Sequence, residues 1–148
     1  MHKIKLSIVA YSGFACFVGF VVAELALEGI ALLAFNVSER DLLSRYFDVT
    51  DSGFRYHFLN LTSFLVECII IMWVYGLARA ALGSAGRGAL VTIAIAMGLV
   101  FIPVAHLALI GVVPAKVFGL SLGFNVVELP FAILIGAALY EARSLPSP

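Results

Sequence analysis

The fold is decided first by residues 6–35, which read LSIVAYSGFACFVGFVVAELALEGIALLAF. This run is apolar almost throughout, and its thirty or so residues exceed the roughly twenty that a helix needs to cross the hydrocarbon of a bilayer. A secretory signal carries an apolar segment of only about 7 to 15 residues before its cleavage site. We therefore expect residues 6–35 to form a retained membrane-spanning helix.

Three further apolar runs, at about 58–80, 89–111 and 116–140, have the length of membrane-spanning helices. The chain is 63% apolar and 12% charged, whereas a soluble domain is about half apolar and a quarter charged. The sequence thus predicts an all-α integral membrane four-helix bundle in a single membrane domain, residues 1–148. We expect it to span a bacterial-type inner membrane or an equivalent bilayer several times.

The connections differ in length and chemistry. Residues 36–57 form the longest, and their helical pattern from Ser38 to Phe47 predicts a short helix lying in the membrane interface. The segment 79–88 is rich in glycine, which predicts a flexible turn. Pro114 is placed to open the fourth helix, which predicts an antiparallel hairpin of the last two helices.

Basic residues favour one orientation of the chain. Lys3, Lys5, Arg79, Arg87 and Arg143 fall on the side of the two termini. Because basic residues next to short connections are retained in the cytoplasm, we expect both ends to lie inside. The formal net charge of zero gives no reason to expect a nucleic-acid partner.

Ionisable residues occur inside all four predicted spans. Glu24, Glu67, His106 and Glu128 each cost a few kcal/mol or more in hydrocarbon, and such residues usually face a bundle interior or a cavity. Counted along the helices, the four lie about 8 to 17 Å from the outer surface. This common depth predicts that they form one cluster in the outer half of the bundle.

Neighbouring polar residues continue the same faces, at spacings of three, four or seven residues. These supporting residues are Glu28 on the first span, Asn60 and Ser63 on the second, and Ser121 and Asn125 on the fourth. Pro103 and Pro130 fall near the layer, and each frees a backbone carbonyl that needs a polar partner. Broken helices beside buried charges are a known way to build ion and substrate sites.

Three functions fit this cluster. It could bind and pass protons or a cation, for which at least one glutamate must hold a proton near neutral pH. It could be the acid-base centre of an enzyme acting on a lipid-like substrate, such as an isomerase or cyclase. It could instead serve a small accessory subunit whose polar stripes bind a larger partner. We rank proton or cation handling first, because the polar stripes open toward the outer surface.

No cofactor is indicated by the sequence. Three carboxylates and an imidazole would suit a divalent metal, but no paired metal-ligand motif appears on any span. The half of the bundle nearer the termini has few polar residues, which favours a homo-oligomer or a larger membrane complex over transport by one chain. The two cysteines, Cys16 and Cys68, lie in apolar runs and are interpreted as packing residues.

Overall fold

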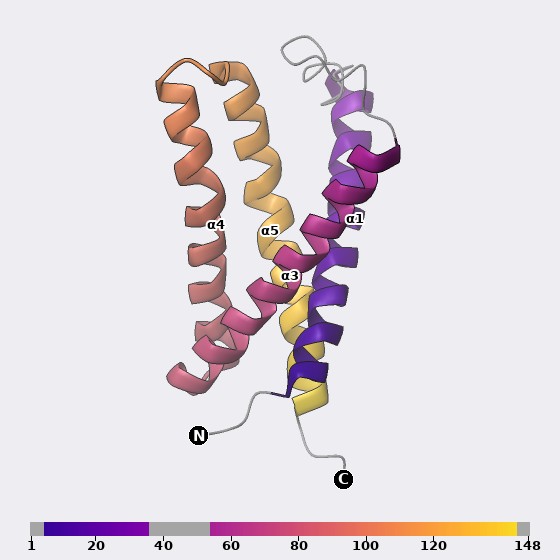
Figure 1. Ribbon diagram of the computed structural model, residues 1–148, viewed down its shortest axis with the longest axis vertical. Coiled ribbons are helices and arrows are strands. Elements are labelled where there is room, and N and C mark those ends of the chain that lie inside the picture. The colour runs from indigo at the N-terminus through magenta and orange to yellow at the C-terminus, as the bar shows by residue number, and fades with distance from the viewer. Residues whose placement is uncertain (1–4, 36–53, 145–148) are drawn as a thin grey trace.

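The computed structural model describes residues 5–35 and 54–144 and consists there of four helices. They are α1 (Leu6–Phe35), α3 (Phe54–Leu82), α4 (Ala85–Leu109) and α5 (Ala115–Ser144). The helices alternate in direction, so the start of α1 and the end of α5 lie at one end of the bundle, and the end of α1 and the start of α5 at the other (Figure 1). We call these the terminal end and the loop end.

All four helices are long and apolar enough to cross a membrane. The four-helix membrane bundle is therefore confirmed, and the first span has the predicted bounds. The predicted interfacial helix lies outside the described residues, and the inward orientation of the ends and the extent of the domain stay predictions.

The predicted flexible turn at 79–88 is wrong, because helix continues through most of it. α3 runs to Leu82 and α4 begins at Ala85, so only Gly83 and Ser84 connect them. Gly83 takes a φ of +65°, a conformation that glycine adopts without strain. Ser84 caps α4 by accepting a hydrogen bond from the backbone N–H of Arg87 at 3.5 Å.

The predicted hairpin of the last two helices is confirmed. α4 ends one residue before Ile110, and Gly111 reverses the chain with a φ of +80°. Pro114 then precedes α5, and its carbonyl accepts the first helical hydrogen bond, from the N–H of Phe118 at 3.0 Å. Pro103 and Pro130 lie inside α4 and α5, as expected.

The packed core occupies only the terminal half of the bundle. α1 packs mainly against α5 and also against α3, while α4 packs against α3 and α5. The largest fully buried side chains are Val9, Ser12, Cys16, Met72, Tyr75, Thr92 and Ile133. α1 and α3 approach closely, since a Cβ at Gly13 would lie 2.7 Å from the Cα of Ile69.

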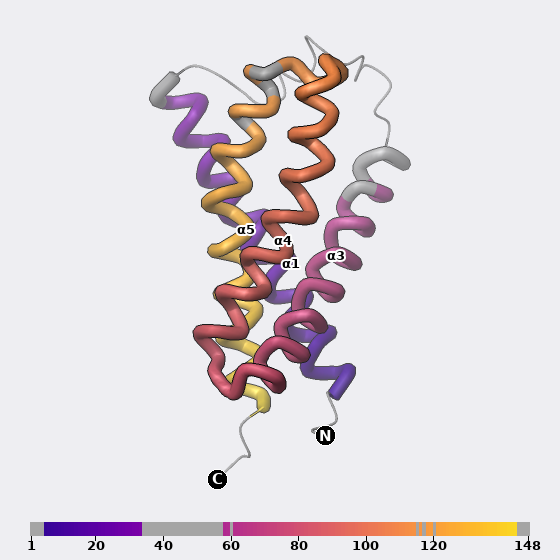
Figure 2. The backbone as a smooth tube through the Cα atoms, turned by 90° about the vertical axis from the view of Figure 1, so that its left-hand side faces the viewer, coloured from indigo at the N-terminus to yellow at the C-terminus, as the bar shows by residue number. Residues whose placement is uncertain are grey.

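The loop half is less densely packed, and we call it the open half for that reason. On each helix one residue marks the last buried side chain toward the loop end: Ala23 on α1, Cys68 on α3, Ala96 on α4 and Glu128 on α5. Between these residues and the loop end, no side chain that the structure describes is buried. The helices diverge toward this end: α1 and α3 lie to one side of the α4–α5 pair in Figure 1 and on opposite sides of it in Figure 2. Glu128 therefore lies at the boundary between the packed half and the open half.

Candidate functional site

Glu128 is the one charged side chain that the described part of the bundle buries. It is 3% exposed, and its Oε1 atom is enclosed. The buried residues that follow it on α5, beginning with Leu129 and Ala132, belong to the core. Glu128 is thus one predicted site residue whose carboxyl lies inside the bundle.

A polar stripe leads from Glu128 toward the loop end of α5. Asn125 and Ser121 lie one and two turns before it and are both partly buried. The side-chain amide of Asn125 donates to the carbonyl of Ser121 at 2.8 Å and to its hydroxyl at 3.3 Å. These contacts turn the amide N–H groups of Asn125 toward Ser121 and the loop end.

Glu24 lies level with Glu128, within about one turn, across the α1–α5 interface. The two helices run antiparallel: the guanidinium of Arg143 lies 4.2 Å from the ring centre of Tyr11, and Gly19 closely approaches Ala132. Continuing this register brings Glu24 opposite the turn that contains Glu128. The Glu24 side chain is nevertheless exposed on the single chain, and Glu28, one turn further, is partly buried.

Glu67 and His106 are also exposed on the single chain. Glu67 precedes the buried Cys68, so it points away from the core face of α3, and Ser63 is exposed as well. His106 lies about one turn from the end of α4, whereas Glu128 lies between three and four turns into α5. The side chain of Asn60 is not among those that the structure describes.

The structure thus buries one of the four predicted site residues and leaves three on the surface of the chain. Within residues 5–35 and 54–144, no three His, Cys, Asp or Glu side chains come close enough together to hold a metal ion. The described chain by itself therefore does not assemble the carboxylate and imidazole site that a hard divalent metal would need. A shared site for the four residues stays a prediction.

A second polar cluster, missed by the sequence analysis, lies at the terminal end. Oε1 of Glu141 accepts hydrogen bonds from the Tyr75 hydroxyl at 2.8 Å and from Nε of Arg79 at 2.9 Å. The ring of Tyr75 also meets that of Tyr140 edge to face, at 5.3 Å between centroids. This cluster ties α3 to α5. The sequence did carry a signal for this cluster: Arg79 and Glu141 have opposite charges and lie near the same end of two predicted helices.

Apolar packing separates Glu128 from this terminal cluster. Apart from Glu128, the buried polar side chains in the described residues are Ser12 and Thr92. Their hydroxyls donate to carbonyls of their own helices, Ser12 to Ile8 at 2.8 Å and Thr92 to Gly88 at 2.8 Å. Each hydroxyl donor is thus satisfied within its own helix, and the side chains packed between the two polar regions are mainly apolar.

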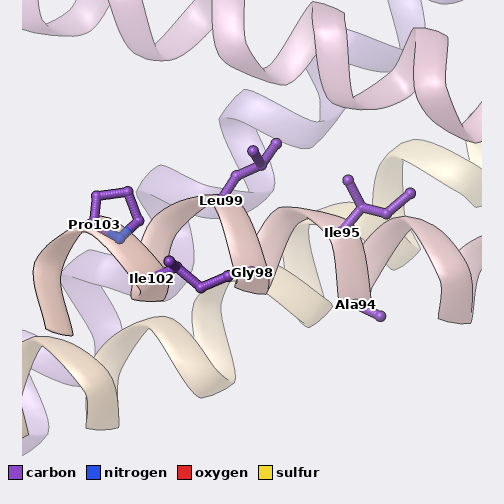
Figure 3. Close-up of a pocket in the computed structure, with 6 residues that line it drawn as sticks. All are labelled: Ala94, Ile95, Gly98, Leu99, Ile102 and Pro103. Carbon is purple, nitrogen blue, oxygen red and sulfur yellow. The ribbon is translucent and has the colours of Figure 1, made fainter. Parts of the chain in front are cut away.

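An apolar groove lies on α4 (Figure 3). It is lined by Ala94, Ile95, Gly98, Leu99, Ile102 and Pro103. The groove contains none of the predicted acid-base residues and is formed by a lipid-facing stretch of one helix, with Leu99 and Ile102 exposed. It offers packing to a lipid chain or a neighbouring helix and no chemistry of its own.

Comparison of the chain with protein-family models, with curated proteins and with solved structures finds no match.

Proposed function

We propose that this protein handles a proton or a cation at Glu128, as a transport or coupling component of the membrane. The observation that carries the proposal is the burial of a carboxyl group, 3% exposed, at mid-helix in a membrane-spanning bundle. Such residues are costly in hydrocarbon and usually mark ion or proton pathways. A residue kept only for packing would more cheaply be apolar.

The surroundings of Glu128 favour access from the loop end. The Asn125–Ser121 stripe provides hydrogen-bonding groups on that side, and Glu24 lies at a similar level on α1. Pro130 removes one helical hydrogen bond, which frees the carbonyl of Val126 close to Glu128. With the termini inside, as the basic residues favour, the loop end would face the outside.

The terminal side favours binding or coupling over free passage. The packed apolar half and the Tyr75–Arg79–Glu141 cluster close the bundle there. A complete transport cycle would need these contacts to open, or a second chain to supply a path.

The exposed ionisable residues support a partner in the bilayer. Glu67 and His106 would face lipid in an isolated chain, at a cost of a few kcal/mol each if charged. We propose that a second copy or a larger membrane complex covers them. Their exposure is also the observation that favours the accessory-subunit alternative. The enzyme alternative has less support, because the rings of Phe20 and Phe64 pack at 4.4 Å and fill space that a lipid-like substrate would use.

Infrared spectroscopy of the protein in liposomes tests the proposal directly. A protonated carboxyl gives a C=O band that disappears when the group ionises. We expect a pH-dependent band in the parent protein that is missing in Glu128→Gln, while the matched control Glu67→Gln, which changes an exposed carboxyl, retains it. Glu128→Gln should be at least as stable as the parent, because the buried ionisable group has been replaced by a neutral amide of the same shape.

The same liposomes provide the functional measurement. Uptake of protons or metal cations driven by a gradient should be lost in Glu128→Gln. A Glu128 band that never changes with pH or cation concentration, together with unchanged uptake in the variant, would leave the residue a structural group and overturn the proposal.

A further inference from the structure

Three sulfur-containing side chains meet inside the packed half, between α1 and α3. Cys16, Cys68 and Met72 are 1%, 3% and 0% exposed. Cys68 and Met72 are four residues apart and therefore lie on one face of α3. Gly13 closely approaches Ile69, and the ring of Phe20 packs against that of Phe64, so Cys16 and Cys68 lie at the same level of the α1–α3 interface. Neither cysteine takes part in a disulfide. We call these three residues the sulfur cluster.

A glycine of α5 completes the enclosure. A Cβ at Gly136 would lie 2.6 Å from Sδ of Met72 and 3.0 Å from Cβ of Cys16. The thioether and the Cys16 side chain therefore converge on one point, and no side chain from α5 stands between them. Any larger residue at this position would push the two apart.

We propose that the sulfur cluster binds a soft monovalent metal ion, Cu(I), with the two cysteines and Met72 as ligands. Thiolate and thioether sulfur select soft ions, whereas oxygen and imidazole ligands select harder ones. Three ligands suit the low coordination numbers of Cu(I), while a structural zinc site needs four. The thiolate is the form that ligates, so the ion displaces a thiol proton on binding.

The apolar surroundings favour the reduced ion as well. Cu(II) prefers nitrogen and oxygen ligands in a square arrangement. The three residues belong to one buried core, whose other members, such as Phe20 and Ile133, are apolar. The backbone carbonyl of Ser12 also reaches this point, 2.9 Å from where a Cβ at Gly136 would lie. A site of this composition therefore holds Cu(I) and disfavours its oxidation in place.

This site is separate from the proton or cation site proposed above. Gly136 lies about two turns beyond Glu128 along α5, toward the terminal end. The two can be tested independently, since Glu128→Gln leaves all three sulfurs in place.

Competition titration tests the proposal. The protein in detergent, kept reduced with a phosphine and without oxygen, is titrated with Cu(I) against a coloured Cu(I) chelator. We expect one ion per chain, with a thiolate-to-copper absorption band. Cys16→Ser and Cys68→Ser should lose the ion. Met72→Leu should weaken binding by at least about tenfold, because removal of a group that only supports the ligands already costs that much. Met97→Leu on α4, a partly buried methionine outside the cluster, is the matched control and should bind as the parent does.

X-ray absorption at the copper edge gives a readout that needs no variant. The parent protein loaded with one equivalent should show a shell of sulfur neighbours alone. A shell containing nitrogen or oxygen, failure of the parent to compete for Cu(I), or undiminished binding by Cys16→Ser would each overturn the proposal.

Discussion

Removal of the Tyr75 hydroxyl probes the terminal cluster with the smallest change. Tyr75 is fully buried, and its hydroxyl donates to Glu141 at 2.8 Å. Tyr75→Phe keeps the ring and its edge-to-face contact with Tyr140, so the hydrogen bond is the main loss. A hydrogen bond to a charged group contributes about 1.5 to 3 kcal/mol.

The lower end of that range applies here. The side chains of Arg79 and Glu141 are 34% and 27% exposed. Water can therefore replace part of the hydrogen bonding that the Glu141 carboxylate loses with the Tyr75 hydroxyl. We expect Tyr75→Phe to lower the free energy of unfolding by about 1.5 kcal/mol, which is roughly tenfold in the equilibrium constant. In a double-mutant cycle with Glu141→Gln, the two changes should be coupled by about 1 kcal/mol.

The assay is unfolding by sodium dodecyl sulfate in mixed micelles, followed by the fluorescence of the single tryptophan, Trp73, on α3. Tyr11→Phe is the matched control: Tyr11 is exposed, and its ring, which Arg143 covers, remains. A loss in Tyr75→Phe no larger than in Tyr11→Phe, or additive effects of Tyr75→Phe and Glu141→Gln, would refute the role assigned to the hydrogen bond.

Two further predictions concern topology and helix packing. A cysteine introduced at Ser84 or Ser147 should be shielded from an impermeant thiol reagent added outside intact cells, and one at Ser52 should react. The native Cys16 and Cys68 are buried and should give little background labelling. Labelling at Ser84 with protection at Ser52 would reverse the predicted orientation. Gly13→Ala places a Cβ 2.7 Å from the Cα of Ile69 and should cost about 1 to 3 kcal/mol of stability. The control Gly29→Ala, with nothing within 4 Å, should be neutral or stabilised by up to about 1 kcal/mol; equal stability of the two variants would contradict the close contact of α1 and α3.

The four helices were predictable because span length and apolar content depend on composition alone. The segment at 79–88 was mispredicted because charge and glycine content were taken to end the helices. Arg79 and Arg87 extend long side chains toward water or a partner while their backbone stays helical. Within this segment a glycine ended the helix only at Gly83, where the chain takes a positive φ.

The candidate site was predicted less completely, for a geometric reason. The spacing of Ser121, Asn125 and Glu128 shows that they share a face of α5, and the structure turns that face at least partly inward. The same spacing on α3 places Ser63 and Glu67 together, yet outward. Because these helices are apolar on all sides, the sequence cannot tell a lipid-facing stripe from a core-facing one. Small residues such as Gly13 and Gly136, where helices approach closely, were the better guide to the inner faces.

The position of Glu128 links the fold to the proposed function. Below it, toward the termini, apolar side chains and a hydrogen-bonded cluster hold α3 and α5 together. Above it, in the described residues, polar groups are present but buried packing is not. A carboxyl in the packed half would be sealed from water, and one well inside the open half would have few core contacts to position it. At the boundary it is held by the core and lies on the same helix as the polar stripe. In the proposed function, a proton or cation arriving from the loop end would meet a fixed acidic group there. If a second chain covers Glu67 and His106, it would close the same half from the side and leave the polar stripe of α5 as the route of access.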